Sequence, residues 1–245
     1  SDTPIQENQV GLYEPWQAIG EGWRPGVEPG TCDSDGIEAL RRPGDIQRDG
    51  VMATLQFSPS DSWVSTLDLF YSEAEQEDTA NQFEVHIGDY NGGHGRLDVT
   101  GAQVNGNNSF TGGTANNVYP LVRGMYNHRE DEIKAFGWSN EFSTERARFL
   151  LDVSYSEATR AEINLENNTQ LLPSPQLDSV QLDIVSGGFS QIVPGHDYSN
   201  PANLYLTNTI YGSGYGKTPS VKDELTGAKF VATVLAPESI GWLYD

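Results

Sequence analysis

Two segments of the chain alternate between apolar and polar residues with a period of two, which is the pattern of a β-strand with one apolar face. In the first segment, turn residues at 58–62 separate two such runs. The pattern therefore predicts a hairpin over 49–72. One face of this hairpin carries Val51, Ala53, Leu55, Phe57, Trp63, Leu67, Leu69 and Tyr71.

The second segment repeats this arrangement around a turn at 143–146 and predicts a hairpin over 131–156. A further alternating run lies near the end of the chain, where we expect a truncated hairpin over 221–245. The apolar face of the second hairpin carries Phe136, Trp138, Phe142, Ala147, Phe149, Leu151, Val153 and Tyr155.

Polar stretches rich in glycine and asparagine separate these hairpins. We expect a loop-rich segment at 1–48, a long loop at 73–130, and loops with one short strand, Val180–Val185, over 157–220. The repeated unit is a strand, a short turn, a second strand and a long polar loop. The chain is therefore predicted to be all-β and antiparallel.

The composition agrees with a loop-rich β-protein. Hydrophobic residues make up 36% of the chain, which is low for a globular core, while 26 Gly and 13 Pro indicate many turns. The 11 Tyr, 9 Phe and 5 Trp argue against a disordered acidic chain. A net charge of −21 disfavours nucleic-acid binding, which requires clustered Lys and Arg.

No residue pattern predicts enzyme chemistry. The four histidines (His86, His94, His128 and His196) fall in predicted loops and form no metal-spaced pair. The glycine clusters lack phosphate-loop spacing, and 33–36 matches only part of a calcium loop. We therefore expect no catalytic residues, no metal site and no cofactor.

Short turns at one end of the strands and long loops at the other are typical of membrane β-barrels. Barrel strands turn apolar side chains towards lipid and polar side chains towards the lumen. Under this interpretation Asp68, Arg148 and Asp152 face the lumen. A soluble β-sandwich or β-solenoid with one wet face also fits the alternation, but such long loops are rare in compact soluble domains.

Particular segments resemble a known family. Residues 48–61 and 65–72 resemble barrel segments of TonB-dependent outer-membrane receptors, in the large branch common in Xanthomonas- and Caulobacter-type bacteria. The resemblance extends in order over roughly 45–235. Further matching segments are 133–138, 151–156, 164–170, 203–208 and 212–216.

The resemblance implies that the chain is an internal part of a 22-stranded transmembrane barrel with long extracellular loops, and that the family's plug domain is absent from it. It implies contact with the outer-membrane lipid of a Gram-negative bacterium and uptake of a scarce ligand of the carbohydrate or siderophore class. TonB, ExbB and ExbD would supply the energy through the missing N-terminal part.

Aromatic and amide residues in the last predicted loops are candidates for binding this small-molecule or oligosaccharide ligand, because aromatic rings stack on sugars while amides form hydrogen bonds. Ordinary loop packing is the alternative. A different function also remains open, a secreted acidic β-protein that binds glycans or acts as an adhesin. The ligand candidates are Tyr198, Asn203, Tyr205, Asn208, Tyr211 and Tyr215.

Overall fold

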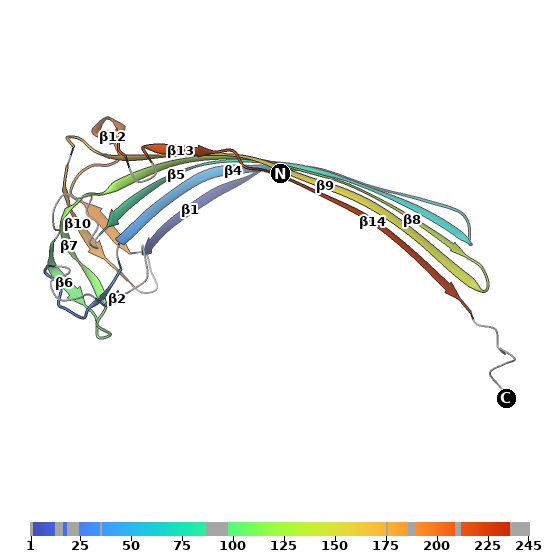
Figure 1. The fold of residues 1–245 in the computed structure, drawn as a ribbon, viewed down its shortest axis with the longest axis horizontal. Coiled ribbons are helices and arrows are strands. Elements are labelled where there is room, and N and C mark those ends of the chain that lie inside the picture. Colours follow the sequence, from blue (N-terminus) through green and yellow to red (C-terminus); the bar gives the residue numbers. More distant parts are fainter. Residues whose placement is uncertain are drawn as a thin grey trace.

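The structure is a computed structural model and describes residues 2–12, 17–18, 25–34, 36–86, 98–174, 176–185, 190–208 and 212–235. The fold is all-β, and the ladders between its strands are antiparallel. Figure 1 shows a long arched sheet with a smaller sheet on the concave side of one end.

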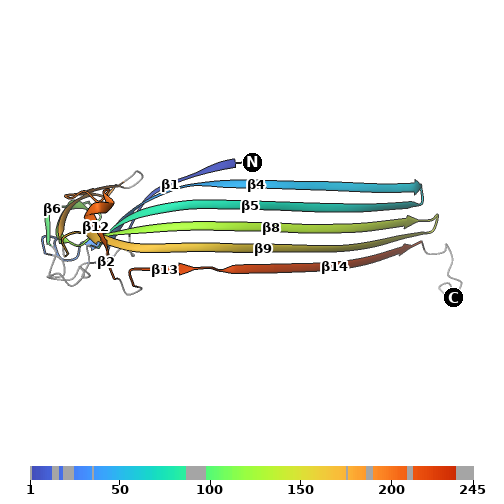
Figure 2. The same ribbon diagram turned by 90° about the horizontal axis from the view of Figure 1, so that it is seen from above.

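The arched sheet has the strand order β1, β4, β5, β8 and β9, and three further strands follow one another along the far edge of β9. Figure 2 shows the strands running side by side along the arch. Four of them are 23 to 25 residues long, far beyond the usual strand. The strands are β1 (Asp2–Leu12), β4 (Gly36–Ser60), β5 (Trp63–His86), β8 (Leu121–Ser143), β9 (Ala147–Leu171), β12 (Leu204–Leu206), β13 (Gly214–Lys217) and β14 (Ser220–Val234).

The two hairpin turns lie where the sequence predicts them, at 61–62 and 144–146, but the strands run much further than predicted. Strand β5 continues to His86, and β8 begins at Leu121, so strands occupy much of the predicted loop at 73–130. This corrects the predicted loops, including the one at 157–220, into which β9 extends. The extensions are polar on both faces, so they lack the alternation on which the prediction relied.

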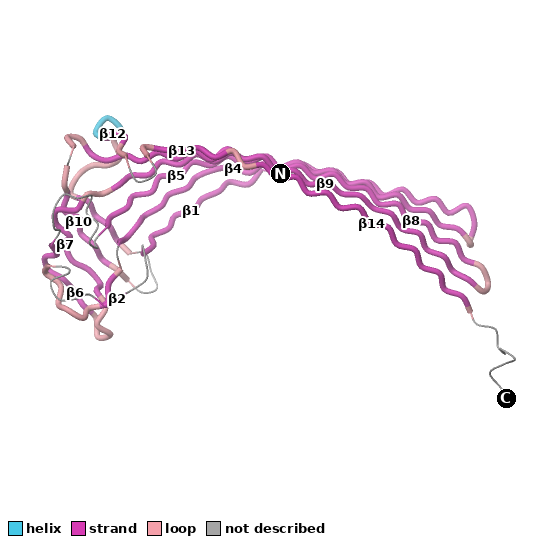
Figure 3. Tube along the Cα trace, in the orientation of Figure 1, coloured by secondary structure: helices cyan, strands magenta, loops and turns pink. Residues whose placement is uncertain are grey.

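The remaining segments are corrected in the same way. Within the predicted loop region 1–48, the structure forms β1 and the first part of β4. The predicted short strand Val180–Val185 corresponds to β10, which spans Asp178–Asp183. Of the predicted hairpin at 221–245, the structure describes β14, and the second strand lies outside the described residues. Figure 3 shows the loops gathered mainly at the end with the small sheet.

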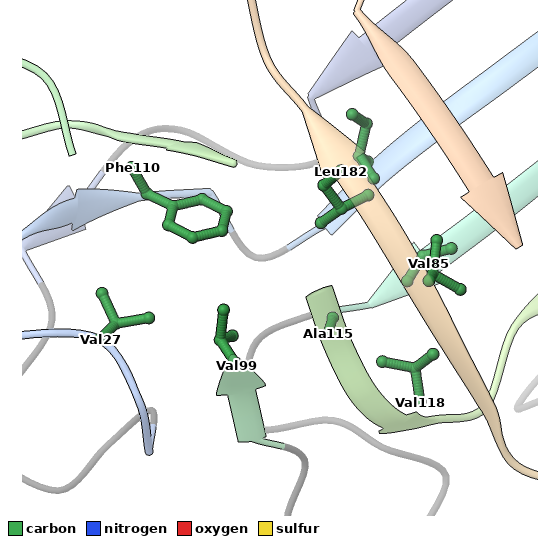
Figure 4. Close-up of a cluster of buried hydrophobic side chains, with 9 residues drawn as sticks. Val27, Val85, Val99, Phe110, Ala115, Val118 and Leu182 are labelled. Atoms are coloured by element: carbon green, nitrogen blue, oxygen red, sulfur yellow. The ribbon is translucent and has the colours of Figure 1, made fainter. Parts of the chain in front are cut away.

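The small sheet has the order β11, β10, β7 and β6. Its hydrophobic core includes Phe110, Val180 and Leu182, and it also takes in Ile37 and Val85 from the arched sheet. Figure 4 shows the side chains of Phe110, Leu182 and Val85 gathered between these elements. The strands are β6 (Asp98–Val104), β7 (Phe110–Val118), β10 (Asp178–Asp183) and β11 (Gln191–Pro194), and a two-stranded ribbon of β2 (Gln17–Ala18) and β3 (Cys32–Asp33) is separate.

One glycine is required where the chain enters this core. Gly26 has a φ of +88°, and a Cβ at this position would lie 1.7 Å from the carbonyl oxygen of Val99. Any other residue would therefore be strained and would push β6 away.

Among the described residues, no helix is long or apolar enough to cross a membrane. The chain contains one short 3-10 helix in its described part, η1 (Pro201–Asn203).

Candidate functional site

The two faces of the arched sheet differ in chemistry near the hairpin turns. Directly opposed residues share a face, and the row through Leu55, Leu67 and Trp138 is apolar across the sheet. Leu55 and Phe57 are 63% and 59% exposed. We call this surface the apolar face. It comprises Ala53, Leu55, Phe57, Trp63, Leu67, Leu69, Phe136, Trp138, Phe142, Phe149, Leu151, Val153, Ala228, Phe230, Ala232 and Val234.

Two tyrosines, Tyr71 and Tyr155, lie at the limit of the apolar face that is farther from the hairpin turns. The Tyr71 hydroxyl donates to Glu73 at 2.8 Å and is 3.2 Å from Glu132. The Tyr155 hydroxyl donates to Glu157 at 3.0 Å. The phenol rings therefore join apolar rows on one side to acidic rows on the other. The acidic rows carry Asp49, Glu73, Glu75, Glu130 and Glu132.

The opposite surface, which we call the polar face, carries all three residues predicted to face a lumen. Asp68 accepts a hydrogen bond from the Thr54 hydroxyl at 2.6 Å. Arg148 forms an ion pair with Glu141, also at 2.6 Å. Asp152 lies opposite Ser139 and Lys229. The structure thus brings Asp68, Arg148 and Asp152 to one face, as the period of two predicts.

A row of larger apolar side chains interrupts the polar face. Met52 lies opposite Phe70, and both are exposed, at 74% and 40%. Leu225 extends the row on β14. The polar face is therefore mixed at mid-height, which the simple alternation did not predict.

Further along the polar face, Asp78 is the centre of a buried hydrogen-bond network. Arg42 approaches its carboxylate with two nitrogens, at 2.7 and 3.0 Å. Asn127 and Gln76 donate at 2.8 and 3.0 Å. Gly44 lies directly opposite, where a Cβ would be 2.5 Å from the Cβ of Asp78, so a glycine makes room for the network.

This network predicts acid sensitivity. Burial raises the pKa of Asp78, but the hydrogen bonds from Arg42, Asn127 and Gln76 outweigh it and hold the pKa below its usual value. A lowered folded-state pKa stabilises the fold above the unfolded pKa of about 4, and the stabilisation is lost as the pH falls through the folded value. The ionised carboxylate therefore contributes fully at neutral pH.

We expect Asp78→Asn to lower the free energy of unfolding by about 1–3 kcal/mol at pH 7, because Arg42 loses its charged acceptor. The loss should shrink as the pH falls below about 4. Denaturant titration across pH measures it. Glu75→Gln, an exposed carboxylate on the other face, is the matched control and should change little. An Asp78→Asn variant as stable as the wild type at pH 7 would contradict the assignment.

A second buried carboxylate lies closer to the small sheet. Glu84 is 1% exposed, and Arg123 lies 3.1 Å from it and 3.3 Å from Glu166. Burial raises the pKa of Glu84, although the nearby guanidinium of Arg123 acts in the opposite direction. Sequence reasoning missed both networks because their partners lie on different strands, tens of residues apart.

Tyr198 is not an open ligand platform. Its ring packs edge-on against Phe83 at 4.8 Å, and its hydroxyl donates to the buried Asp178 at 3.1 Å. Burial, together with the charge of Asp178, raises the pKa of Tyr198. Its place beside the small-sheet core supports the loop-packing alternative.

Tyr205 and Tyr215 lie along the edge of β9, on the polar face. The Tyr205 hydroxyl is 2.6 Å from that of Tyr119 and 2.7 Å from that of Ser174. Tyr215 donates to Glu166 at 2.8 Å. The structure thus brings two of the four candidate tyrosines to one face and gives their hydroxyls internal partners.

The remaining ligand candidates do not gather into a site. Asn203 ends η1, and its carbonyl accepts from the Leu172 amide at 2.8 Å. The Asn208 side chain accepts from Ser213 at 2.6 Å. Tyr211 lies outside the described residues.

Histidines and carboxylates form no metal cluster within the described part of the chain. His128 lies within β8 and not in a predicted loop, with Glu130 at 3.3 Å. His196 is 2.8 Å from the Asp178 carboxylate, which also accepts from the amides of 179, 195 and 196. The Asp178 carboxylate therefore stabilises the backbone at 195–196 through these hydrogen bonds. His94 lies outside the described residues.

Comparison with known proteins adds no family. No protein-family model, no curated protein and no solved structure matches the chain. The two faces of the arched sheet and their charge networks are thus the features from which a function can be argued.

Proposed function

We propose that the chain is a wall segment of a membrane-spanning β-barrel, within a TonB-dependent outer-membrane receptor that takes up a scarce carbohydrate or siderophore. The observation that carries the proposal is the apolar face. It exposes whole rows of large hydrophobic side chains and ends at tyrosines, as a lipid-facing band with an aromatic girdle does.

The height of the apolar face supports a membrane. The eight residue steps from Trp63 to Tyr71 on β5, at roughly 3.3 Å each, cover about 26 Å along the strand. With a strand tilt of about 40°, this corresponds to about 20 Å across a bilayer, close to the apolar band of about 25 Å in outer-membrane barrels. The strands then continue beyond the tyrosines to the small sheet.

The edges of the arched sheet support a barrel over a free sheet. Strand β1 pairs with β4 only from Ile37 to Gln47, and the rest of β4 has no neighbour on that side among the described residues. Strand β14 likewise pairs only with β9 in the described chain. Unpaired backbone groups are costly in lipid, so this proposal requires further strands to pair with both edges and close the wall. In this proposal the polar face lines the lumen.

The test is fluorescence quenching by lipids with brominated acyl chains. Trp63 and Trp138 lie on the apolar face, so we expect bromolipid to quench the emission that they contribute. A variant with both Trp63→Phe and Trp138→Phe isolates that contribution, because the remaining tryptophans stay in place. We also expect the chain to aggregate when detergent is removed.

The opposite result has a clear meaning. A soluble monomer that unfolds cooperatively without detergent, with no quenching by bromolipid, would contradict the barrel. It would favour the secreted glycan-binding protein instead.

A further inference from the structure

A row of exposed hydrophobic side chains crosses the polar face, where contact with lipid does not explain it. Met52, Phe70 and Leu225 are 74%, 40% and 68% exposed. They share one row of the arched sheet, in which the shorter Ala135 and Ser156 separate Phe70 from Leu225. Exposed apolar surface with polar residues around it is typical of ligand-binding surfaces. The Phe70 ring is therefore a starting point for a ligand on this face.

Short side chains leave space next to the Phe70 ring. Gly137 lies opposite Asp68, and apart from its chain neighbours a Cβ at Gly137 would meet only the Cβ of Asp68, at 4.0 Å. Gly227 lies opposite Ser154, and a Cβ there would be 2.7 Å from the Ser154 hydroxyl oxygen, so the glycine leaves this hydroxyl uncovered. Adjacent strands are about 4.8 Å apart, so the three intervals from β5 to β14 span about 14 Å. A small ring-shaped molecule can therefore lie against the sheet beside Phe70.

The carboxylates around this space lack the arginine partners that carboxylates have further along the polar face. Asp68 Oδ1 accepts from the Thr54 hydroxyl at 2.6 Å, and Oδ2 has no partner among the described residues. Asp152 lies opposite Lys229, but its carboxylate forms no hydrogen bond or ion pair within the described part of the chain. The same holds for the Ser154 hydroxyl. A ligand can therefore bind these oxygen atoms without breaking an internal network.

We propose that Phe70, Asp68, Asp152 and Ser154 form a subsite for a neutral sugar ring. A sugar ring presents C–H groups on its face and hydroxyl groups around its rim. The Phe70 ring contacts the C–H face, while the two carboxylates accept hydrogen bonds from the hydroxyl groups. An apolar contact surface with a few placed polar groups is the usual composition of a small-molecule site.

The charges of the subsite select the class of ligand. Asp68 and Asp152 outnumber the single cation opposite them, Lys229, so an anionic ligand would be repelled. Ionised carboxylates only accept hydrogen bonds, so the ligand must supply donors, as sugar hydroxyl groups do. The inference rests on the proposed function, because it places the subsite on the lumen wall and narrows the transported ligand to a carbohydrate.

The test is the binding of maltotriose to the full chain, followed by ligand-observed NMR in micelles of a detergent without a sugar head group, with citrate as the anionic probe. We expect saturable maltotriose binding and no citrate binding. Phe70→Ala should weaken maltotriose binding about tenfold, because the stacking surface is lost. Phe136→Ala is the matched control, since Phe136 is 42% exposed but lies on the apolar face, and it should change binding less than about twofold.

Conservative variants separate binding from folding. Phe70→Leu keeps an apolar side chain without the ring and should bind about fivefold more weakly, whereas Phe70→Tyr keeps the ring and should bind within about twofold of the wild type. Asp68→Asn with Asp152→Asn keeps the size of both side chains but removes the charged acceptors, which should weaken binding about tenfold.

Four results would each overturn the subsite. They are a wild-type chain that does not bind maltotriose, full binding by Phe70→Leu, full binding by the Asp→Asn double variant, and a loss in Phe136→Ala equal to that in Phe70→Ala. Bromolipid quenching decides the barrel independently, because these variants leave every tryptophan in place. Maltotriose binding without quenching would keep the subsite and reject the barrel.

Discussion

Leu67→Lys will lower the stability of the chain in lipid by about 2–4 kcal/mol, whereas Thr66→Lys, one residue away, will cost less than about 1 kcal/mol. The two residues are neighbours on β5 and are both half-buried, but they point to opposite faces. Leu67 lies between Leu55 and Trp138, where an ammonium group would enter the hydrocarbon. Thr66 lies between Gln56 and Ser139, where it would be solvated.

The measurement is urea-induced unfolding in lipid vesicles, followed by tryptophan emission and by protease protection. The paired design matches the strand, the depth and the introduced charge, so the two variants differ mainly in the face and in the side chain that belongs to it. Equal destabilisation by the two lysines would mean that neither face meets lipid, and the barrel would have to be abandoned. Greater destabilisation by Thr66→Lys would reverse the assignment of the faces.

The turns and the chemistry of the faces could be predicted from the sequence because both are local. The turn at 61–62 and the alternation on either side fix which residues share a face, so Asp68 and Asp152 were placed together correctly. The ends of the strands could not be predicted in this way. Beyond Tyr71 and Tyr155, both faces are polar and pairing depends on partners from other strands.

The small sheet could not be predicted for a different reason. Its core joins Phe110 and Leu182 with Val85, from segments that are remote in the sequence. Short strands with few apolar positions give a weak signal, and the strand of the small sheet that the alternation predicts most clearly is β10. The tyrosine candidates were also chosen from local sequence. Their positions in predicted loops suggested Tyr198 and Tyr205, but the hydroxyl partners of these residues come from segments remote in the sequence.

The charge networks lie largely in the parts of the strands that the sequence did not predict. Asp78, Glu84 and Asp131 are each held by arginines from neighbouring strands, at heights where the apolar pattern has ended. Ion pairs across strands thus help to stabilise the polar extensions, whereas hydrophobic alternation specifies the sheet near the turns. Asp78 and Glu84 lie in the segment for which the sequence predicts a long loop.

The small sheet should be able to lose its core, which it shares with Ile37 and Val85 at one end of the arched sheet, without unfolding the hairpins near the turns. Phe110→Ala should destabilise the small sheet by about 3–5 kcal/mol, because Phe110 is fully buried and the change leaves a cavity in a small core. Backbone amides of β6, β7 and β10 should then exchange with solvent about a hundredfold faster or more. Amides of β9 near Leu151, which are held by ladders on both sides, should keep their protection.

Hydrogen-exchange mass spectrometry in micelles resolves these segments as separate peptides. Val104→Ala is the control, because Val104 lies opposite Phe110 in the same ladder but is 40% exposed, so it should accelerate exchange far less. Equal acceleration throughout both sheets after Phe110→Ala would show that they unfold as one unit. The small sheet would then be part of the wall, and strands as long as β5 would owe their order beyond Tyr71 to its core.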